Sequence, residues 1–295
     1  MADGFVVVAN AAAGSTEDAV VHEVAGRLAV AAPTTVSWTE AESDFDEALD
    51  GLDGRRLVVV GGDGTLHFAL NRLAANDRLD EVIGIVPAGT GNDFARGAGI
   101  PVDPASAVEL ILTAATHRFP VIDVGGTELA HNNAHAGLGL VAAERGTAWK
   151  PRLGRFAYPT ATLVEGLSFD GIEITVASGD EVLHDGSALA VLVLLGPSMG
   201  GGIEPIADVQ LDEPLLEVVV IEPVEARGRP ALALAALRDR LDQGDGVRRS
   251  SVAEVTLTAP GALRCDVDGE IRRWSEPVTF SIRSPGWNVI ASPPR

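Results

Sequence analysis

Two stretches decide the fold of the first part of the chain: LVVVGGDGT at residues 57–65 and VIGIVPAGTGNDFAR at residues 82–96. Each begins with a short apolar run rich in β-branched residues, which is typical of a buried strand, and continues into a glycine-rich turn. Apolar residues at helical spacing follow the first turn, and a helix is expected to start near Asp93 in the second. This order of strand, turn and helix, met twice in succession, predicts a parallel α/β sheet.

The neighbouring residues extend the same pattern. Residues 5–9 form a further apolar strand, which ends at Asn10 and a turn of small residues. Helical patterns follow at residues 16–31 and, beyond the second stretch, at 104–115. Residues 1–120 are therefore expected to form one α/β domain.

The pattern changes near Pro120. From there, turn residues separate short apolar runs, as in an antiparallel sandwich or barrel, and the runs are residues 121–124, 171–177, 188–195, 215–221, 252–257 and 278–282. Helical patches interrupt them at residues 158–167 and 230–241. We expect residues 121–295 to form a β-sandwich domain, and it is left open whether its last strands pack back on the first domain.

The charge balance narrows the class of partner. The 295 residues include 22 Lys and Arg against 42 Asp and Glu, a formal net charge of −20. A surface this acidic repels nucleic acid, so nucleic acid is not an expected partner. Lys150 is the only lysine. An ordinary acidic protein and a halophilic one, adapted to molar salt, are both open interpretations. The selective loss of lysine favours the second, in which salt screens self-repulsion.

Cysteine content and hydropathy indicate a cytoplasmic protein. Cys265 is the only cysteine, which excludes an intrachain disulfide and zinc sites built from several thiolates. The longest apolar run, residues 188–195, is too short to span a bilayer, and no basic leader precedes the first apolar run. Peripheral association with the inner face of the membrane is left open.

The two glycine-rich turns are candidate phosphate-binding loops. Glycine lets a ligand approach the main chain, and the start of the following helix favours an anion. In an open parallel sheet, ligands sit beyond the carboxyl ends of the strands, where both turns would lie. Neither turn has the Gly-Lys-Ser/Thr ending of a P-loop. A tight structural turn would explain either one alone, whereas two such turns, each with an aspartate, favour a binding site.

In combination, GGDGT and GTGNDFAR resemble the motifs of the diacylglycerol kinase family of lipid kinases. GGDGT alone is shared with NAD kinases, while GTGNDFAR points to the lipid-kinase branch. Further matches extend almost to the C-terminus, and they are Asp123, Gly154, Ala157, Tyr158, Gly200, Gly201, Gly202, Pro205, Ala207, Asp268, Gly269 and Glu270. The resemblance implies an α/β nucleotide-binding domain followed by a β-sandwich domain, with the active site in the cleft between them.

The resemblance also implies roles for particular residues. The phosphates of ATP would be bound by residues that follow the first strands: Asn10, Gly61, Gly62, Asp63, Gly64, Thr65, Gly89, Thr90, Gly91, Asn92 and Arg96. Asp63, Asp93 and Asp123 would hold Mg²⁺, for which carboxylate oxygens are suitable ligands. Glu270 would be the general base, with Asp268 beside it as a second catalytic residue. Taken alone, the Asp-Gly pair is equally well explained as a hairpin turn.

The features together predict an ATP- and Mg²⁺-dependent kinase. It would transfer the γ-phosphate to the hydroxyl of a diacylglycerol-like or diether-glycerol-like lipid at a membrane surface. Two alternatives are kept, an NAD kinase-like phosphotransferase and a catalytically weak regulator that binds nucleotide or lipid. The regulator is kept because family members commonly have glutamate at the third position after GGDGT, where this chain has Phe68. A homodimer is also left open.

Overall fold

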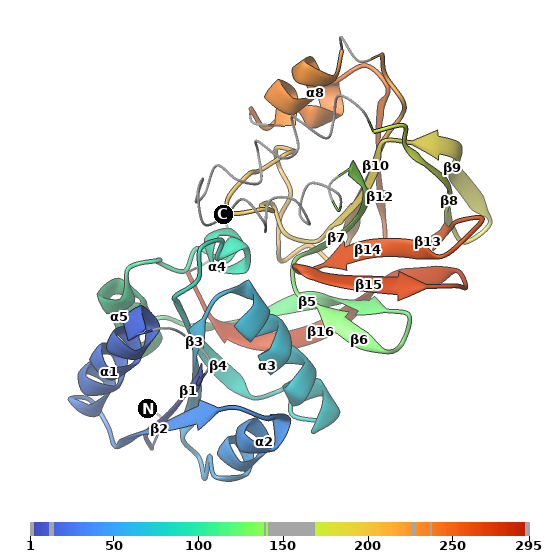
Figure 1. The fold of residues 1–295 in the computed structure, drawn as a ribbon. Coiled ribbons are helices and arrows are strands. Elements are labelled where there is room, and N and C mark those ends of the chain that lie inside the picture. The colour runs from blue at the N-terminus through green and yellow to red at the C-terminus, as the bar shows by residue number, and fades with distance from the viewer. Residues whose placement is uncertain are drawn as a thin grey trace. The chain divides into compact units, whose positions relative to one another are not determined.

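The computed structural model describes residues 3–11, 15–138, 140, 169–225, 228–236 and 238–292. The chain divides into two compact units, residues 1–121 together with 284–295, and residues 122–283. It enters the second unit along strand β5 (Thr116–Val124) and returns along β16 (Val278–Ile290) (Figure 1). Gly154, Ala157 and Tyr158, together with the helix predicted at 158–167, lie outside the described residues.

The first unit contains a parallel sheet whose successive strands are connected along the chain by helices (Figure 1). Its elements are β1 (Phe5–Asn10), α1 (Ser15–Ala29), β2 (Thr34–Thr39), α2 (Glu42–Asp50), β3 (Arg56–Gly61), α3 (Asp63–Ala75), β4 (Val82–Pro87), α4 (Asp93–Gly97) and α5 (Pro104–Thr113). The strand order is β2-β1-β3-β4, all parallel, and the last residues of β16 pair in parallel with β4. The predicted parallel α/β domain is confirmed.

Burial explains the sequence pattern of these strands. β1 and β3 are buried along almost their whole length, which is why FVVVAN and RLVVVG contain continuous apolar runs. β2 lies at the edge of the sheet and is only partly buried, so TTVSWT lacks that signal and was not predicted. Helix α5 begins at Pro104 because Asp103 caps it, its carboxylate accepting the N–H of Ser106.

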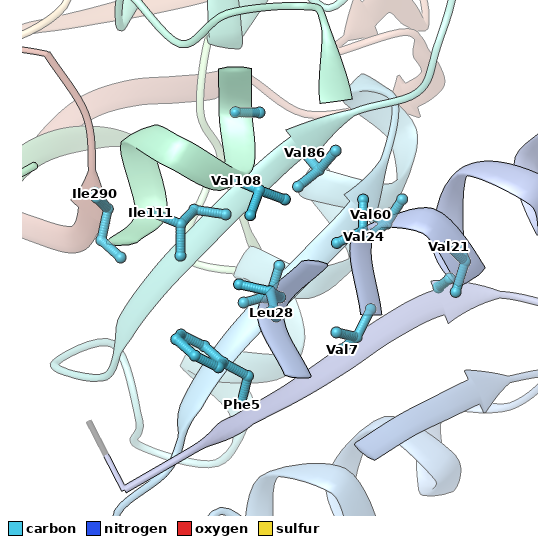
Figure 2. Close-up of a cluster of buried hydrophobic side chains, with 13 residues drawn as sticks. Phe5, Val7, Val21, Val24, Leu28, Val60, Val86, Val108, Ile111 and Ile290 are labelled. Atoms are coloured by element: carbon cyan, nitrogen blue, oxygen red, sulfur yellow. The ribbon is translucent and has the colours of Figure 1, made fainter. Parts of the chain in front are cut away.

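One hydrophobic cluster joins α1 and α5 to the sheet of the first unit (Figure 2). Helix α1 contributes Val21, Val24 and Leu28, which recur at helical spacing and are fully buried. The cluster also contains apolar side chains of β1, β3, β4 and α5. Ile290, at the end of β16, packs in the same cluster, so the last strand is part of the core of the first unit.

The second unit contains two antiparallel sheets, and the predicted β-sandwich domain is confirmed. One sheet has the order β12-β11-β10-β7-β14-β15, and the other contains β16-β13-β8-β9, with β5 beside β16 and β6 beside β5. The strands not yet given are β6 (Glu128–Ala130), β7 (Asn133–Gly137), β8 (Ile172–Ser178), β9 (Glu181–Ala188), β10 (Ala190–Leu194), β11 (Leu216–Ile221), β12 (Val247–Val252), β13 (Glu254–Thr258), β14 (Leu263–Val267) and β15 (Glu270–Trp274).

The last strand is longer than predicted: the prediction ended it at residue 282, whereas β16 ends at Ile290. Strand β16 continues through Pro285 and Gly286 to Ile290, although a proline and a glycine are normally turn signals. The glycine has a packing reason, because a Cβ at Gly286 would lie 2.2 Å from the carbonyl oxygen of Phe119 in β5. Close approach of two backbones, and not a turn, therefore explains Gly286.

The helix predicted at residues 230–241 is longer than the one observed. Helix α8 (Arg229–Ala236) ends at Ala236, and a short 3₁₀ helix, η2 (Leu241–Gln243), follows a turn. The N–H of Arg240 bonds back to the carbonyl of Ala235, which lets the chain turn before Leu241 packs into the core of this unit. None of the helices in the described parts of the chain is long and apolar enough to cross a bilayer.

Candidate functional site

The carboxyl ends of three strands bring the predicted phosphate-binding residues to one edge of the first sheet. The parallel register pairs Ala9 with Val60, and Gly61 with Pro87, so Asn10 and both glycine-rich turns follow at the same edge. In the order β2-β1-β3-β4, the chain goes from β1 to β2 on one side and then continues with β3 and β4 on the other side of β1. The topological switch point therefore lies between β1 and β3. Open α/β sheets bind ligands at such a switch point.

The two glycine-rich turns touch each other through their backbones. A Cβ at Gly62 would lie 2.9 Å from the Cα of Gly89, and a Cβ at Gly89 would lie 2.5 Å from the Cα of Gly62. The N–H of Ala88 donates to the carbonyl of Gly61 at 2.9 Å. Neither glycine can therefore carry a side chain unless the turns move apart, which links both motifs in one structure.

Asn92 fixes the second turn from within. Its backbone has the left-handed conformation, with φ 54° and ψ 43°. Its Oδ1 accepts the N–H of Gly89 at 3.0 Å, and its Nδ2 donates to the carbonyl of Gly89 at 2.9 Å. The exposed side chain of Arg96 donates through Nε to the carbonyl of Gly91 at 3.1 Å. The asparagine thus holds the loop that Gly89, Thr90 and Gly91 form.

Helix α3 starts directly at the first turn. Gly62 is its N-cap and Asp63 its first residue, and the first N–H groups of a helix have no partner within the helix. Gly64, in the first turn of α3, is exposed, and a Cβ there would meet no atom of the described residues within 4 Å. Packing within the described part of the chain therefore does not explain the glycine at position 64, which lies beside the helix N-terminus.

The side chain of Thr65 explains why the first residue of the GGDGT motif, Gly61, is a glycine. A Cβ at Gly61 would lie 2.4 Å from Thr65 Oγ1, so the threonine side chain fills the space beside this glycine. Phe68, at the position where the family resemblance predicts glutamate, packs edge-on against Phe45 of α2 with ring centroids 5.6 Å apart. That position contributes to the contact between α2 and α3.

The aspartates predicted to hold a metal fall in both units. Asp63 Oδ1 accepts the N–H of Phe94 at 3.3 Å, which ties the starts of α3 and α4 together, and Asp93 is buried at the start of α4. Asp123 belongs to the second unit, where its Oδ1 accepts the N–H of Gly126 at 2.7 Å. Across the described ranges, no three His, Cys, Asp or Glu side chains gather as a metal site. The carboxylates of Asp63 and Asp93 are nevertheless the oxygen donors that Mg²⁺ prefers.

In the second unit, Glu270 follows a tight hairpin turn. Strands β14 and β15 pair Val267 with Glu270, which leaves Asp268 and Gly269 as a two-residue loop with φ of 50° and 93°. Positive φ at both positions is the geometry that favours Asp-Gly, so the hairpin-turn interpretation is confirmed. The Glu270 side chain is 55% exposed, and its Oε2 lies 3.7 Å from Nη1 of Arg272.

Asp268 differs from Glu270 in that main-chain groups occupy its carboxylate. Its side chain is fully buried. Oδ2 accepts the N–H of His131 at 2.7 Å, and Oδ1 accepts the N–H groups of Asn132 at 3.1 Å and Asn133 at 3.0 Å. These donors lie 135 to 137 residues earlier in the chain, so sequence spacing could not identify them.

The fold and this edge of the sheet define a class of protein: a two-domain α/β and β-sandwich protein with a candidate phosphate-binding edge. The family models agree with it. The diacylglycerol kinase catalytic domain matches residues 4–124, and the YegS C-terminal NAD kinase beta sandwich-like domain matches residues 132–291. The chain belongs to the diacylglycerol kinase family, among its YegS-like members.

Individual relatives support the same assignment. A protein of Stenotrophomonas maltophilia named "Probable lipid kinase YegS-like" is 33% identical over 203 residues, which is 64% of this chain and 64% of that protein. A relative of the same name from Pseudomonas aeruginosa is 31% identical over 280 residues, 88% of this chain and 87% of its own length. The chain also resembles a crystal structure of a diacylglycerol kinase from Bacillus anthracis, with a TM-score of 0.76 and 19% sequence identity. The match covers 99% of this chain and 98% of that one. That last likeness concerns the fold alone.

Proposed function

We propose that this protein is an ATP- and Mg²⁺-dependent lipid kinase that phosphorylates the hydroxyl of a diacylglycerol-like or diether-glycerol-like lipid. The observation that carries the proposal is the backbone contact between Gly62 and Gly89. It joins two glycine-rich turns beside the N-terminus of α3, at the switch point of a parallel sheet. Membership of a family whose relatives are named lipid kinases supports the choice of reaction.

The nucleotide would be bound by main-chain groups of the first unit. Asn10, Gly61, Gly62, Gly64 and Thr65 would surround the phosphates from one side. Gly89, Thr90, Gly91 and Asn92 form the adjoining turn, and Arg96 offers an exposed guanidinium suited to phosphate oxygens. N–H groups at the start of α3 favour the negative charge of a triphosphate.

The reaction would then need one proton acceptor. The lipid hydroxyl oxygen attacks the γ-phosphorus, the bond from that phosphorus to the bridging oxygen of the β-phosphate breaks, and ADP leaves. The hydroxyl proton passes to the carboxylate of Glu270, whose exposed side chain is free of the main-chain bonds that occupy Asp268.

Asp63 and Asp93 would hold Mg²⁺, with Asp123 as a further ligand in the predicted set. When bound, the ion would neutralise charge on the phosphate oxygens. Asp63 has a second task within the protein itself, because its carboxylate also accepts the N–H of Phe94 and so connects the two helix starts.

The substrate is tested with purified protein, labelled ATP and Mg²⁺ in low and molar salt. The acceptors are vesicles containing diacylglycerol or diether glycerol, and NAD without lipid. We expect label in the lipid fraction. Transfer to NAD alone would replace the proposal by an NAD kinase, and ATP binding without transfer to any acceptor would indicate a regulator.

Glu270→Gln tests the base. Loss of the proton acceptor is expected to lower kcat on the order of 10²- to 10⁴-fold, with ATP affinity unchanged. Glu276→Gln is the matched control, because Glu276 is another exposed glutamate of the second unit, located after β15. Equal activity of Glu270→Gln and the control would remove Glu270 from the mechanism.

A further inference from the structure

Two buried carboxylates hold the turn that precedes Glu270, one from each side. Asp266, in β14, accepts the N–H of Gly269 through Oδ1 at 2.7 Å. Asp268 accepts the N–H groups of three consecutive residues, of which the first two precede β7 and the third, Asn133, begins it. Asp268 also donates its own N–H to the carbonyl of Asn133 at 3.0 Å. The turn is thus bound both to itself and to the neighbouring strand.

The hairpin does not need these bonds in order to turn. Asp-Gly with positive φ at both positions already satisfies a two-residue loop. Burying two carboxylates is unfavourable unless hydrogen bonds compensate, and here four main-chain N–H groups do so. Two buried carboxylates with four hydrogen bonds are more than a two-residue loop requires, and the residue that directly follows this loop is Glu270.

We propose that Asp266 and Asp268 are positioning residues that fix the start of β15, and with it the side chain of Glu270. The proposal rests on the proposed function, because it takes Glu270 as the base. Gly269, bound by Asp266, and Asp268, bound to β7, are the two residues immediately before Glu270. Both of its preceding peptide groups are therefore held in place.

Neither carboxylate is available as the base itself. The Asp268 side chain is fully buried, and that of Asp266 is 8% exposed. Among the described residues, His131 and His135 face them, with His131 Nε2 3.6 Å from Asp268 Oδ2 and His135 Nε2 3.9 Å from Asp266 Oδ1. The thiol of Cys265, the residue before Asp266 in β14, also feels the charge of Asp266. Burial lowers the pKa of His135, more than the nearby Asp266 raises it, which favours the neutral imidazole.

The test compares Asp266→Ala with Asp266→Asn, because the asparagine Oδ1 can still accept the N–H of Gly269 and the alanine cannot. We expect kcat of the alanine variant to fall on the order of ten- to hundredfold through misplacement of Glu270, with KM for ATP unchanged. The asparagine variant should be close to the wild type. The acid limb of the pH profile of kcat should stay at its wild-type pH in both variants, since the base is unchanged.

Asp268→Asn extends the test and covers the case in which Asp266→Ala does not fold. Its new amide group faces the N–H of His131 where an oxygen accepted before, so kcat should again fall with KM for ATP unchanged. Wild-type kcat in both Asp266→Ala and Asp268→Asn, or an acid limb displaced by either, would overturn the proposal.

Amide hydrogen exchange separates this proposal from the proposed function. If no lipid accepts phosphate, the kinase proposal fails, yet exchange at Gly269 can still be measured. Asp266→Ala should exchange this amide at least about tenfold faster than Asp266→Asn, because only alanine removes the acceptor. Equal exchange in the two variants would show that Asp266 does not hold the turn.

Discussion

The glycine-rich turns of the first unit and the Asp266–Glu270 hairpin of the second use main-chain donors in opposite ways. At the turns, glycine leaves open space beside the first N–H groups of α3. At the hairpin, the protein's own carboxylates accept the N–H groups of Gly269 and of His131, Asn132 and Asn133. The first region keeps main-chain N–H groups beside an exposed glycine, as our proposal of a phosphate site requires. In the second region two of the three carboxylates are buried and hydrogen-bonded, and only the third, that of Glu270, is exposed.

The largest effect is expected from Gly89→Ala, because the two glycine-rich turns are held together by backbone contact. The new Cβ would lie 2.5 Å from the Cα of Gly62, and the turns must separate. We expect the free energy of unfolding to fall by about 1–3 kcal/mol and ATP binding to be lost. Chemical denaturation and calorimetry measure the two effects. Gly26→Ala, in α1 with nothing within 4 Å, is the control and should bind ATP normally.

Gly64→Ala should affect ATP binding without lowering the stability of the fold. Alanine is favoured over glycine within a helix and meets nothing here, so stability should stay the same or rise by about 0.5–1 kcal/mol. A methyl group in the space beside the helix N-terminus should weaken ATP binding at least about tenfold, or 1.4 kcal/mol. Unchanged ATP affinity would mean that the phosphates do not lie against this residue.

Glu217 provides the reference for a carboxylate with a structural role alone. Burial by itself would raise the pKa of Glu217, but hydrogen bonds from Arg249 Nε and Ser251 Oγ, both at 2.7 Å, outweigh it and hold the pKa below its ordinary value. A lowered pKa in the folded state stabilises the fold above the unfolded pKa, near 4.5, and this contribution is lost as pH falls through the folded value.

Glu217→Gln is therefore expected to lower the free energy of unfolding by about 1–2 kcal/mol at pH 7. The difference from the wild type should begin to narrow as pH falls below the unfolded pKa, near 4.5, and should shrink further as pH falls through the lower folded pKa. Kinase activity should not change, unlike in the Asp266 and Asp268 variants. Denaturation curves at several pH values measure the effect, and a difference that stays constant from pH 7 through the acid range would contradict it.

The smallest effect concerns Cys265, in β14 beside Asp266. Burial, and secondly the charge of Asp266, raise the pKa of the Cys265 thiol to about 12. Because the thiolate is the reactive form, a water-soluble disulfide reagent at pH 8 should label the thiol only after denaturation. Labelling of the native protein at the rate of a free thiol would show that the interior of the hairpin opens to solvent.

Local sequence chemistry predicted the parallel sheet, both glycine-rich turns and the hairpin before Glu270. β-Branched runs, glycine and Asp-Gly each constrain the backbone within a few residues, so they can be interpreted without knowledge of the fold. The edge strand β2 and the continuation of β16 past Pro285 were missed. Their formation depends on neighbouring strands that the local pattern does not describe.

From the sequence alone, the family, the two domain types and the residues of the two glycine-rich motifs could be established. The tertiary structure was needed to explain why Gly62 and Gly89 are glycines, and to show which main-chain donors surround Asp268. The reason is physical: main-chain N–H groups are the same in nearly every residue and carry no side-chain signature. Which of them meet a carboxylate or remain open to a ligand is decided when strands distant in sequence pair.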